Sequence, residues 1–140
     1  MARDVSKDGE YIKTTEGRIP WLWMPTEALR GRFTTMSDVW SFGVVLWEIV
    51  TLGQLPYKGI KGVVELYGKL KDGIRLEKPP HCSGDLYNVM LLCWQNCPEE
   101  RPTFKELRAI LHNILHTQTR TYINVEYFDE QAMTTGWDHL

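Results

Sequence analysis

Histidine and cysteine pairs are the residues whose spacing could support metal chemistry. His112 and His116 lie four residues apart in a segment of helical periodicity, so both imidazoles would share one helix face and could bind a metal ion together. Asn113 stands where a metalloprotease helix carries its general-base Glu, and no third ligand is evident. A solvated helix face explains the pair better, so we predict no metal site.

Cys93 and Cys97 are also four residues apart, but Cys93 belongs to an apolar stripe and is expected to be a small buried hydrophobic side chain. With Cys82, the chain has three cysteines at spacings that fit no paired zinc site. Reduced thiols in an intracellular compartment are the simplest interpretation. The sequence contains no G-x-S-x-G, G-x-x-x-x-G-K or G-x-G-x-x-G motif, so it shows no complete catalytic apparatus.

Glu27 and Arg101 are the polar residues with the strongest reason to interact, although 74 positions separate them. Each lies beside apolar sequence, Ala28-Leu29 in one case and Phe104 in the other, where an unpaired charge would be costly. Their separation in the sequence does not by itself show that the two charges pair, and the opposite signs could be a coincidence.

Composition indicates one globular domain. The chain has 140 residues, a net charge of −2 and 43% hydrophobic residues, which excludes a disordered chain and a nucleic-acid binder that relies on bulk positive charge. No apolar run approaches the roughly 18 residues of a membrane span. Residues 1–10 are charged and lack a hydrophobic region, so we expect neither a membrane span nor a signal peptide in the chain as given.

Helices from residue 37 onward must position these side chains. Residues 1–36 show no helical or alternating period, which predicts a long irregular segment of the kind that is usually functional or disordered. Ser37-Asp38 offers a cap and a carboxylate for a helix over residues 38–51, which is apolar on every face and should be buried centrally. Gly53 and Pro56 are expected to end it.

Three further helices follow in the prediction. A weak amphipathic helix covers residues 63–71, and Asp85 is expected to cap another over residues 86–95. Thr103-Phe104-Lys105-Glu106 is typical of a capping box and starts the clearest apolar stripe. Residues 117–140 are rich in Thr, Gln, Asn and acids, which predicts a mobile tail.

The run from Ser37 to Glu48, Ser-Asp-Val-Trp-Ser-Phe-Gly-Val-Val-Leu-Trp-Glu, resembles the central helix in the C-terminal lobe of protein tyrosine kinases. The stretch from Cys93 to Phe104 is similar to that family's penultimate junction, and residues 1 to about 116 match the family in order. Receptor tyrosine kinases of the growth-factor-receptor type are most similar, on the runs Thr51-Leu52-Gly53, Pro56-Tyr57 and Gly17-Arg18-Ile19-Pro20.

This resemblance implies a mainly α fold. Residues 37–116 would form the helical C-terminal lobe of a kinase, residues 1–36 the irregular activation segment before it, and residues 117–140 a flexible tail. Tyr11 matches the second of the paired activation-loop tyrosines. Its phosphorylation would add about −1.5 to −2 charges, and could order the loop against Arg3 or Arg18. An exposed loop tyrosine without a role is the alternative.

The resemblance also implies a substrate pocket, whose wall accepts the residue after the substrate tyrosine and whose candidates are Pro20, Trp23 and Met24. Here the sequence departs from the family. Trp21 and Leu22 replace a small aliphatic and a basic residue, and Pro25-Thr26-Glu27 stands where Ala-Pro-Glu is usual. The shifted proline moves the missing N–H by one position. A divergent pocket and a flawed gene model both fit.

Glu27 would pair with Arg101 in the family arrangement and tie the end of the activation segment to the helical core. Removing one partner of such a buried pair would lower the folding stability by about 3–5 kcal/mol, because the other charge stays buried without a partner. Asp38 matches an aspartate whose carboxylate accepts N–H groups of the catalytic loop, although an acid that complements the helix dipole is a sufficient interpretation. The catalytic loop, the metal-binding residues and the phosphate-binding groups would precede residue 1, so we expect no catalytic residue here.

Two tail tyrosines are candidate docking sites. Tyr122-Ile123-Asn124-Val125 resembles the phosphotyrosine-x-Asn signal that adaptor domains bind through a basic pocket. Tyr127 precedes Phe128-Asp129-Glu130 and is acidic enough in context to be a kinase substrate. The alternative is that these tail tyrosines have no function.

The favoured interpretation is the C-terminal lobe of a receptor-type protein tyrosine kinase, on the cytoplasmic side of the plasma membrane in a single-pass receptor, or else cytoplasmic. The intact parent would use ATP and Mg to phosphorylate protein tyrosines, whereas this chain would bind no cofactor and no nucleic acid. The alternative is a non-catalytic, truncated, kinase-like interaction module. Asp-Phe-Gly and His-Arg-Asp motifs upstream of Met1 would distinguish the two.

Overall fold

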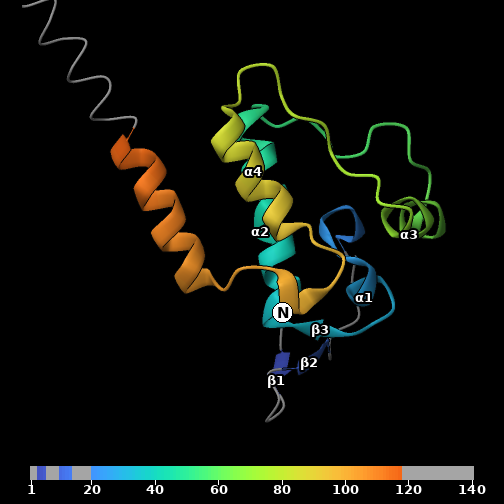
Figure 1. The fold of residues 1–140 in the computed structure, drawn as a ribbon. Coiled ribbons are helices and arrows are strands. Elements are labelled where there is room, and N and C mark those ends of the chain that lie inside the picture. The colour runs from blue at the N-terminus through green and yellow to red at the C-terminus, as the bar shows by residue number, and fades with distance from the viewer. Residues whose placement is uncertain (1–2, 6–9, 14–19, 118–140) are drawn as a thin grey trace, which may run out of the picture.

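The computed structural model describes residues 3–5, 10–13 and 20–117, the first two ranges by their backbone. Helices α2 (Thr35–Val50) and α4 (Gly84–Cys93) lie side by side at its centre. Figure 1 shows the short helices to one side of this pair and the last helix, residues 104–117, to the other. The regular elements of the described residues after position 37 are all helical, so the mainly α prediction is confirmed.

A small antiparallel sheet lies below the helices (Figure 1). Strand β2 (Glu10–Lys13) pairs with β1 (Arg3–Val5) on one side and with β3 (Phe33–Thr34) on the other. These strands fall in the segment predicted to be irregular. Each is at most four residues long, too short to show a period of two, and β3 meets β2 only through the tertiary fold.

Helix α2 begins at Thr35, not at residue 38 as predicted, because Thr34 caps it. The Thr34 hydroxyl oxygen accepts hydrogen bonds from the backbone N–H of Met36 at 3.1 Å and of Ser37 at 3.3 Å. The Ser37 hydroxyl accepts in turn from the Thr34 N–H at 3.1 Å, which completes a capping box. The sequence prediction chose the second member of this box as the cap.

Helix α3 (Val63–Lys71) has the predicted bounds. Helix α4 begins at Gly84 instead of residue 86, because the Ser83 hydroxyl caps it by accepting from the Leu86 N–H at 3.2 Å. Asp85, the predicted cap, lies in the first turn, where its charge complements the helix dipole.

The last helix follows a single 3-10 turn, η2 (Pro98–Glu100). Its cap is the predicted one, since the Thr103 hydroxyl accepts from the Glu106 N–H at 3.1 Å. Phe104 meets Phe42 of α2 edge to face, with ring centroids 5.9 Å apart.

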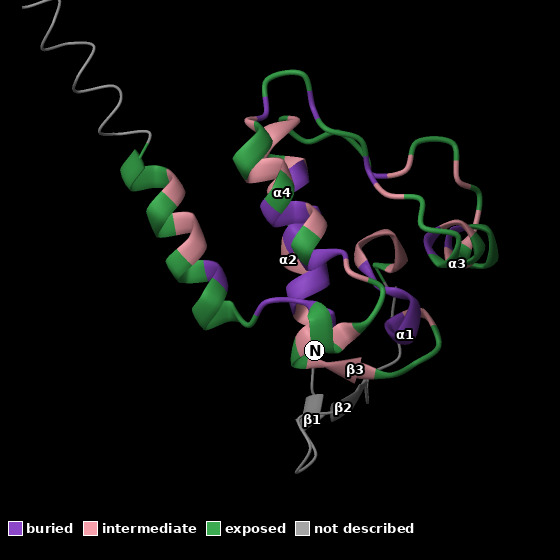
Figure 2. Ribbon diagram, in the orientation of Figure 1, coloured by how far each residue is buried: buried purple, intermediate pink, exposed green. Residues whose placement is uncertain are grey.

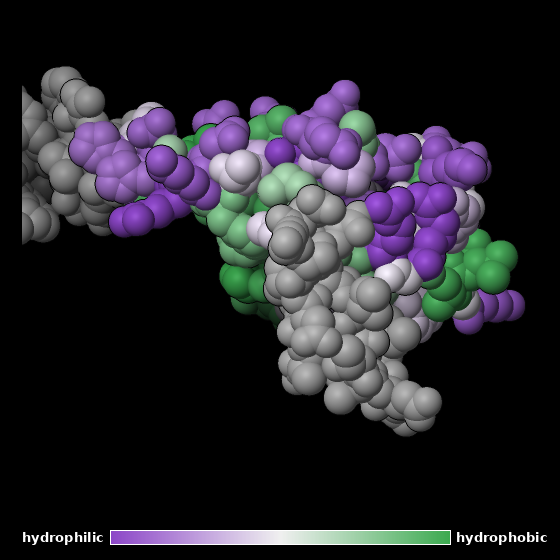
Figure 3. Space-filling model, turned by 90° about the horizontal axis from the view of Figure 1, so that it is seen from below, coloured by the Kyte–Doolittle hydropathy of each residue, from purple (hydrophilic) through white to green (hydrophobic). Residues whose placement is uncertain are grey.

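The core is centred on the inner face of α2. Figure 2 shows buried residues along this face and along the facing side of α4. The outer face differs from the prediction of burial all round, because Val45 is 40% exposed and Ile49 65% exposed. Figure 3 shows hydrophobic side chains gathered at two separate places on the surface. The main buried hydrophobic residues are Val39, Trp40, Val44, Trp47, Leu66, Leu70, Leu76, Val89, Met90, Cys93, Trp94 and Leu107.

Candidate functional site

Glu27 and Arg101 form a buried, bidentate salt bridge. Arg101 Nη1 donates to Glu27 Oε2 at 2.7 Å and Nη2 donates to Oε1 at 3.0 Å. Glu27 is 8% exposed and Arg101 is 3% exposed. Because the two planar groups meet as forks, the pair fixes orientation as well as distance. It fastens the short helix α1 (Thr26–Leu29) to the segment that precedes the last helix.

Neighbouring groups satisfy the remaining polar atoms of this pair. Arg101 Nε donates to the carbonyl of Gln95 at 2.8 Å, and Nη1 also donates to the carbonyl of Met36 at 2.9 Å. The Ser37 hydroxyl donates to Glu27 Oε2 at 2.9 Å. A buried charge costs little when its hydrogen-bonding capacity is filled in this way. Four chain segments therefore converge on one ion pair.

Residues 20–24 are fastened to α2. They contain the 3-10 turn η1 (Trp21–Trp23). Trp23 Nε1 donates to Glu48 Oε1 at 2.7 Å, and the Ser41 hydroxyl donates to the Trp23 carbonyl at 2.6 Å. Met24 is buried and Pro20 is exposed. The three predicted pocket residues thus lie in one short segment held against the central helix.

The departures from the family pattern are accommodated in this segment. Trp21 and Leu22 are half-buried and pack against the core. Pro25 is buried and occupies the N-cap of α1, where its carbonyl accepts from the Leu29 N–H at 3.0 Å. A proline at this position removes no intrahelical hydrogen bond, because the donors at a helix N-terminus lack helical partners. The shifted proline therefore does not break α1.

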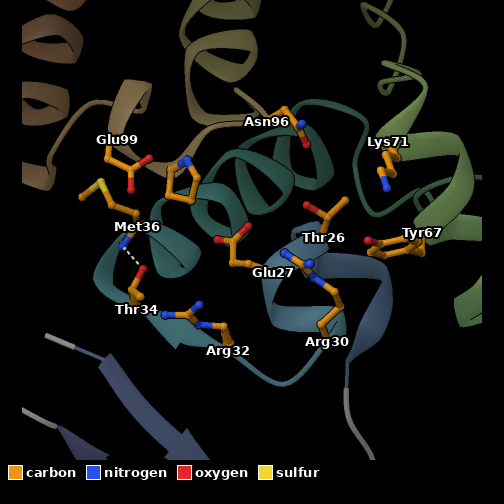
Figure 4. A pocket seen from close by; sticks show the side chains of 11 residues that line it. Thr26, Glu27, Arg30, Arg32, Thr34, Met36, Tyr67, Lys71, Asn96 and Glu99 are labelled. Atoms are coloured by element: carbon orange, nitrogen blue, oxygen red, sulfur yellow. Dashed lines mark hydrogen bonds between the residues drawn. The ribbon is translucent and has the colours of Figure 1, made fainter. Parts of the chain in front are cut away.

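A cleft of about 530 Å³ opens beside Glu27. Figure 4 shows the side chains of Thr26, Tyr67 and Lys71 facing one another between α1 and α3. Lys71 also lies 5.8 Å from the centroid of the Tyr67 ring. Basic side chains outnumber acidic ones, and one of the acids is already paired with Arg101. The charged residues of the lining are Arg30, Arg32, Lys71, Glu27 and Glu99.

Comparison with known protein families matches residues 1–111 to the protein tyrosine and serine/threonine kinases. The chain belongs to this kinase family. It is 47% identical over 131 residues to the tyrosine kinase receptor Cad96Ca of Drosophila melanogaster, which covers 93% of this chain and 17% of that protein. It is 46% identical over 134 residues to a fibroblast growth factor receptor of Hydra vulgaris, which covers 95% of this chain and 16% of that protein.

Together with the helices of the structure, this family match shows a C-terminal lobe of the kinase fold that is similar to receptor tyrosine kinases. It spans less than a fifth of the length of both receptors. Among the helices of residues 20–117, none is long and apolar enough to cross a bilayer.

The other predicted kinase site residues divide into three groups. Asp38 is half-buried in the first turn of α2. Arg3 and Tyr11 lie in paired strands, where Tyr11 is opposite both Val5 and Phe33. The remaining candidates lie outside the described residues: Arg18, Tyr122, Asn124 and Tyr127.

The kinase family implies ATP and magnesium, but the residues present do not fit this pair of ligands by themselves. The sequence has no G-x-G-x-x-G loop. Among the described residues, no three His, Cys, Asp or Glu side chains cluster in a way that could hold a metal ion. The stacked rings of His112 and His116, 6.2 Å apart, share an exposed helix face but have no third ligand there. We therefore derive no catalytic step from this chain.

The sequence-based reasoning missed the residues that complete the ion pair. Ser37 was interpreted only as a helix cap, and Trp40 only as core. The Arg101 guanidinium lies over the Trp40 ring at 5.1 Å, and Arg75 lies over the same ring at 4.8 Å. Arg75 stands among other charged residues in the stretch from Lys71 to Lys78, so nothing specific in the sequence distinguishes it.

Proposed function

We propose that this chain acts as the C-terminal lobe of a receptor-type protein tyrosine kinase, whose intact form transfers phosphate from ATP to protein tyrosines. The observation that carries the proposal is the Glu27–Arg101 fork, which holds α1, the helix that follows the proposed substrate wall, against the helical core. In the intact kinase this lobe would supply the substrate wall, the Tyr11 switch and the scaffold beneath the active site. It would then lie on the cytoplasmic side of a membrane receptor, and both relatives are receptors by name.

The switch part of the proposal concerns Tyr11. Its strand β2 lies between β1 and β3, so a charge change at this residue acts on a sheet that joins the N-terminal segment to the start of α2. A phosphate there would pair most favourably with a bidentate arginine. Arg3 and Arg18 are the candidates. Asp38, in the first turn of α2, would anchor the catalytic loop.

The first test uses the intact kinase encoded with its upstream sequence. We expect that sequence to contain Asp-Phe-Gly and His-Arg-Asp, and the purified protein to phosphorylate tyrosine in a Glu/Tyr copolymer in the presence of ATP and magnesium. Arg3→Ala and Arg18→Ala are compared with Arg108→Ala on the exposed last helix. Loss of activation by Tyr11 phosphorylation in one of the first two, but not in Arg108→Ala, supports the switch.

Two results would overturn the proposal. Absence of the upstream motifs, or a purified intact protein without tyrosine kinase activity, favours the non-catalytic interaction module. Full activation of both arginine variants would exclude Arg3 and Arg18 as partners of phosphorylated Tyr11, but it would not contradict the kinase function.

Adaptor docking by the tail has a separate test. A peptide of residues 118–128 phosphorylated at Tyr122 should bind an adaptor phosphotyrosine-reading domain, and the Asn124→Ala peptide should bind much more weakly. A peptide phosphorylated only at Tyr127 is the matched control. Equal binding of the Asn124→Ala peptide contradicts the docking role.

A further inference from the structure

A second cavity, of about 770 Å³, involves none of the proposed kinase residues. Its volume falls within the range of small-molecule pockets, about 300–1,000 Å³. It is bounded by the end of α2, the following loop, α3 and the segment after α3. Its lining residues are Trp47, Gln54, Leu55, Tyr57, Lys58, Ile60, Lys69, Ile74, Arg75, Leu76 and Glu77.

Arg75 is held rigidly in the wall of this cavity. Its Nε donates to the Trp94 carbonyl at 2.8 Å, and its Nη1 donates to the carbonyls of Leu70 and Ile74, each at 2.9 Å. The guanidinium carbon lies 4.8 Å from the centroid of the Trp40 ring. Such a group loses little conformational freedom when a ligand binds, because the protein has already oriented it.

The charge of Arg75 is not offset by a carboxylate within the described part of the chain. Its Nη2 group makes no hydrogen bond there, and the Glu77 side chain, which lines the same cavity, forms no ion pair with it. Burial, with a further contribution from the nearby Arg101, lowers the pKa of Arg75. Lys58 and Lys69 add positive charge to the lining. An anion in the cavity would relieve this imbalance.

The rest of the wall is apolar and partly strained. Leu55 is 61% exposed, and Ile74 is 46% exposed, so both present hydrophobic surface to an occupant. Tyr57 has a positive φ of 51°, and its buried hydroxyl has no hydrogen-bond partner. Strained residues of this kind persist only where the surrounding structure holds them, and they cluster at ligand sites.

We propose that this cavity binds a small molecule that carries an oxyanion, either carboxylate or phosphate, on an apolar body. The oxyanion accepts hydrogen bonds from Arg75 Nη2, and the apolar body packs against Trp47 and Leu55. A concave site lined by several chain segments suits a compact molecule better than an extended peptide, which needs a groove or a sheet edge.

The test uses the ¹⁵N-labelled 140-residue chain and four probes: benzoate, phenyl phosphate, neutral benzamide and inorganic phosphate. We expect benzoate or phenyl phosphate to shift the signals of the Trp47 indole N–H and of Arg75 Nε–H in a saturable way. Benzamide should bind about tenfold more weakly, because it cannot accept a charge-assisted hydrogen bond. The stronger of the two anionic probes identifies the oxyanion, and inorganic phosphate alone should bind weakly because it lacks the apolar body.

Matched variants locate the binding. Lys69→Gln should weaken the anionic probe several-fold, whereas Lys71→Gln, which lies in the cleft beside Glu27, should leave its affinity unchanged. Arg75→Lys should also weaken binding, with the fold checked by circular dichroism. If Arg75→Lys does not fold, the probe series and the lysine pair decide the question.

Three outcomes would overturn the proposal. The first is equal affinity for benzoate and benzamide, and the second is a set of shifts that map to the cleft of Thr26 and Tyr67. The third is the absence of a saturable shift at about 10 mM probe, a concentration that would saturate a site with a Kd near 1 mM.

Discussion

Arg75 and Arg101 lie over the same indole ring of Trp40, yet only Arg101 faces a carboxylate within the described residues. The two arginines therefore have different surroundings although both contact the Trp40 ring. Glu27 neutralises the charge of Arg101, and both carboxylate oxygens of Glu27 accept hydrogen bonds, so this pair has a structural role. Around Arg75, the Nη2 group makes no hydrogen bond within the described residues, and the proposed oxyanion would be its acceptor.

Glu27→Gln should cost about 3–5 kcal/mol of unfolding free energy, because Arg101 would keep its charge in a buried position without a carboxylate. Urea unfolding followed by circular dichroism measures this loss. Glu106→Gln on the exposed last helix is the control. A cost below about 1 kcal/mol, the value of an exposed ion pair, would show that water reaches the fork.

The cysteines should differ in reactivity with pH. Burial raises the pKa of Cys93 to about 12, so its thiolate is scarce in the folded state at neutral and mildly basic pH. Cys97 is exposed, and its pKa is raised because its thiol donates to Glu99 Oε2 at 2.9 Å. At pH 8 we expect a thiol reagent to label Cys97 first, and Cys93 only on unfolding.

Glu99→Ala should accelerate the labelling of Cys97 at pH 8, since it removes the hydrogen bond that favours the thiol over the thiolate. Asp72→Ala, remote from this cysteine in the chain, should have no effect. Rapid labelling of Cys93 in the native protein would contradict its burial.

At the scale of elements, one glycine determines how closely α2 and α4 approach. A Cβ atom at Gly43 would lie 2.7 Å from Trp94 Nε1 and 2.8 Å from Cys93 Cβ. These distances are shorter than van der Waals contact, so the two helices could keep their present separation only without that atom. The glycine also explains why Trp94 is buried although it follows the end of α4.

Gly43→Ala should destabilise the chain by about 1–3 kcal/mol through overpacking. Gly68→Ala in α3 is the matched control, because a Cβ there meets nothing within 4 Å. It should instead gain about 0.5–1 kcal/mol from helix propensity. Thermal unfolding of the two variants beside the parent chain gives both values. A stabilising Gly43→Ala would show that α2 and α4 separate readily.

At the scale of the whole molecule, the lobe divides into a dense centre and a lightly attached last helix. Figure 2 shows the last helix as largely exposed beside the buried α2–α4 pair. Leu107 is its one fully buried residue, and Ile110, Leu111 and Ile114 are half-buried. Because local stability follows buried apolar contact, this helix should open more easily than the centre.

Hydrogen exchange should therefore protect the amides of residues 112–117 less than those of α2 and α4. Protection should rise toward Leu107, where the helix contacts the core. Equal protection along the last helix and α2 would show that the lobe unfolds as one unit, which contradicts this division.

The sequence predicts a helix well where its start and end depend on residues only a few positions away. The bounds of α3 and the cap at Thr103 follow from propensity and capping chemistry within a few residues. The caps of α2 and α4 were each placed too late, because Thr34 and Ser83 stand just before residues that are themselves good caps. Strands β1 to β3 were not predicted because each is at most four residues long, too short to show a period of two, and β3 meets its partner β2 only through the tertiary fold.

The sequence by itself determined the helical character of this kinase lobe, its central apolar helix and the residues that resemble the family, since periodicity and motif depend on neighbours along the chain. It also identified Glu27 and Arg101, but only as two charges beside apolar residues. The tertiary structure decided that they meet, that Ser37 and Met36 complete them, and that Arg75 lies across the same ring without a counter-ion in the described residues. Pairing and burial depend on positions far apart in the chain, and only folding brings those together.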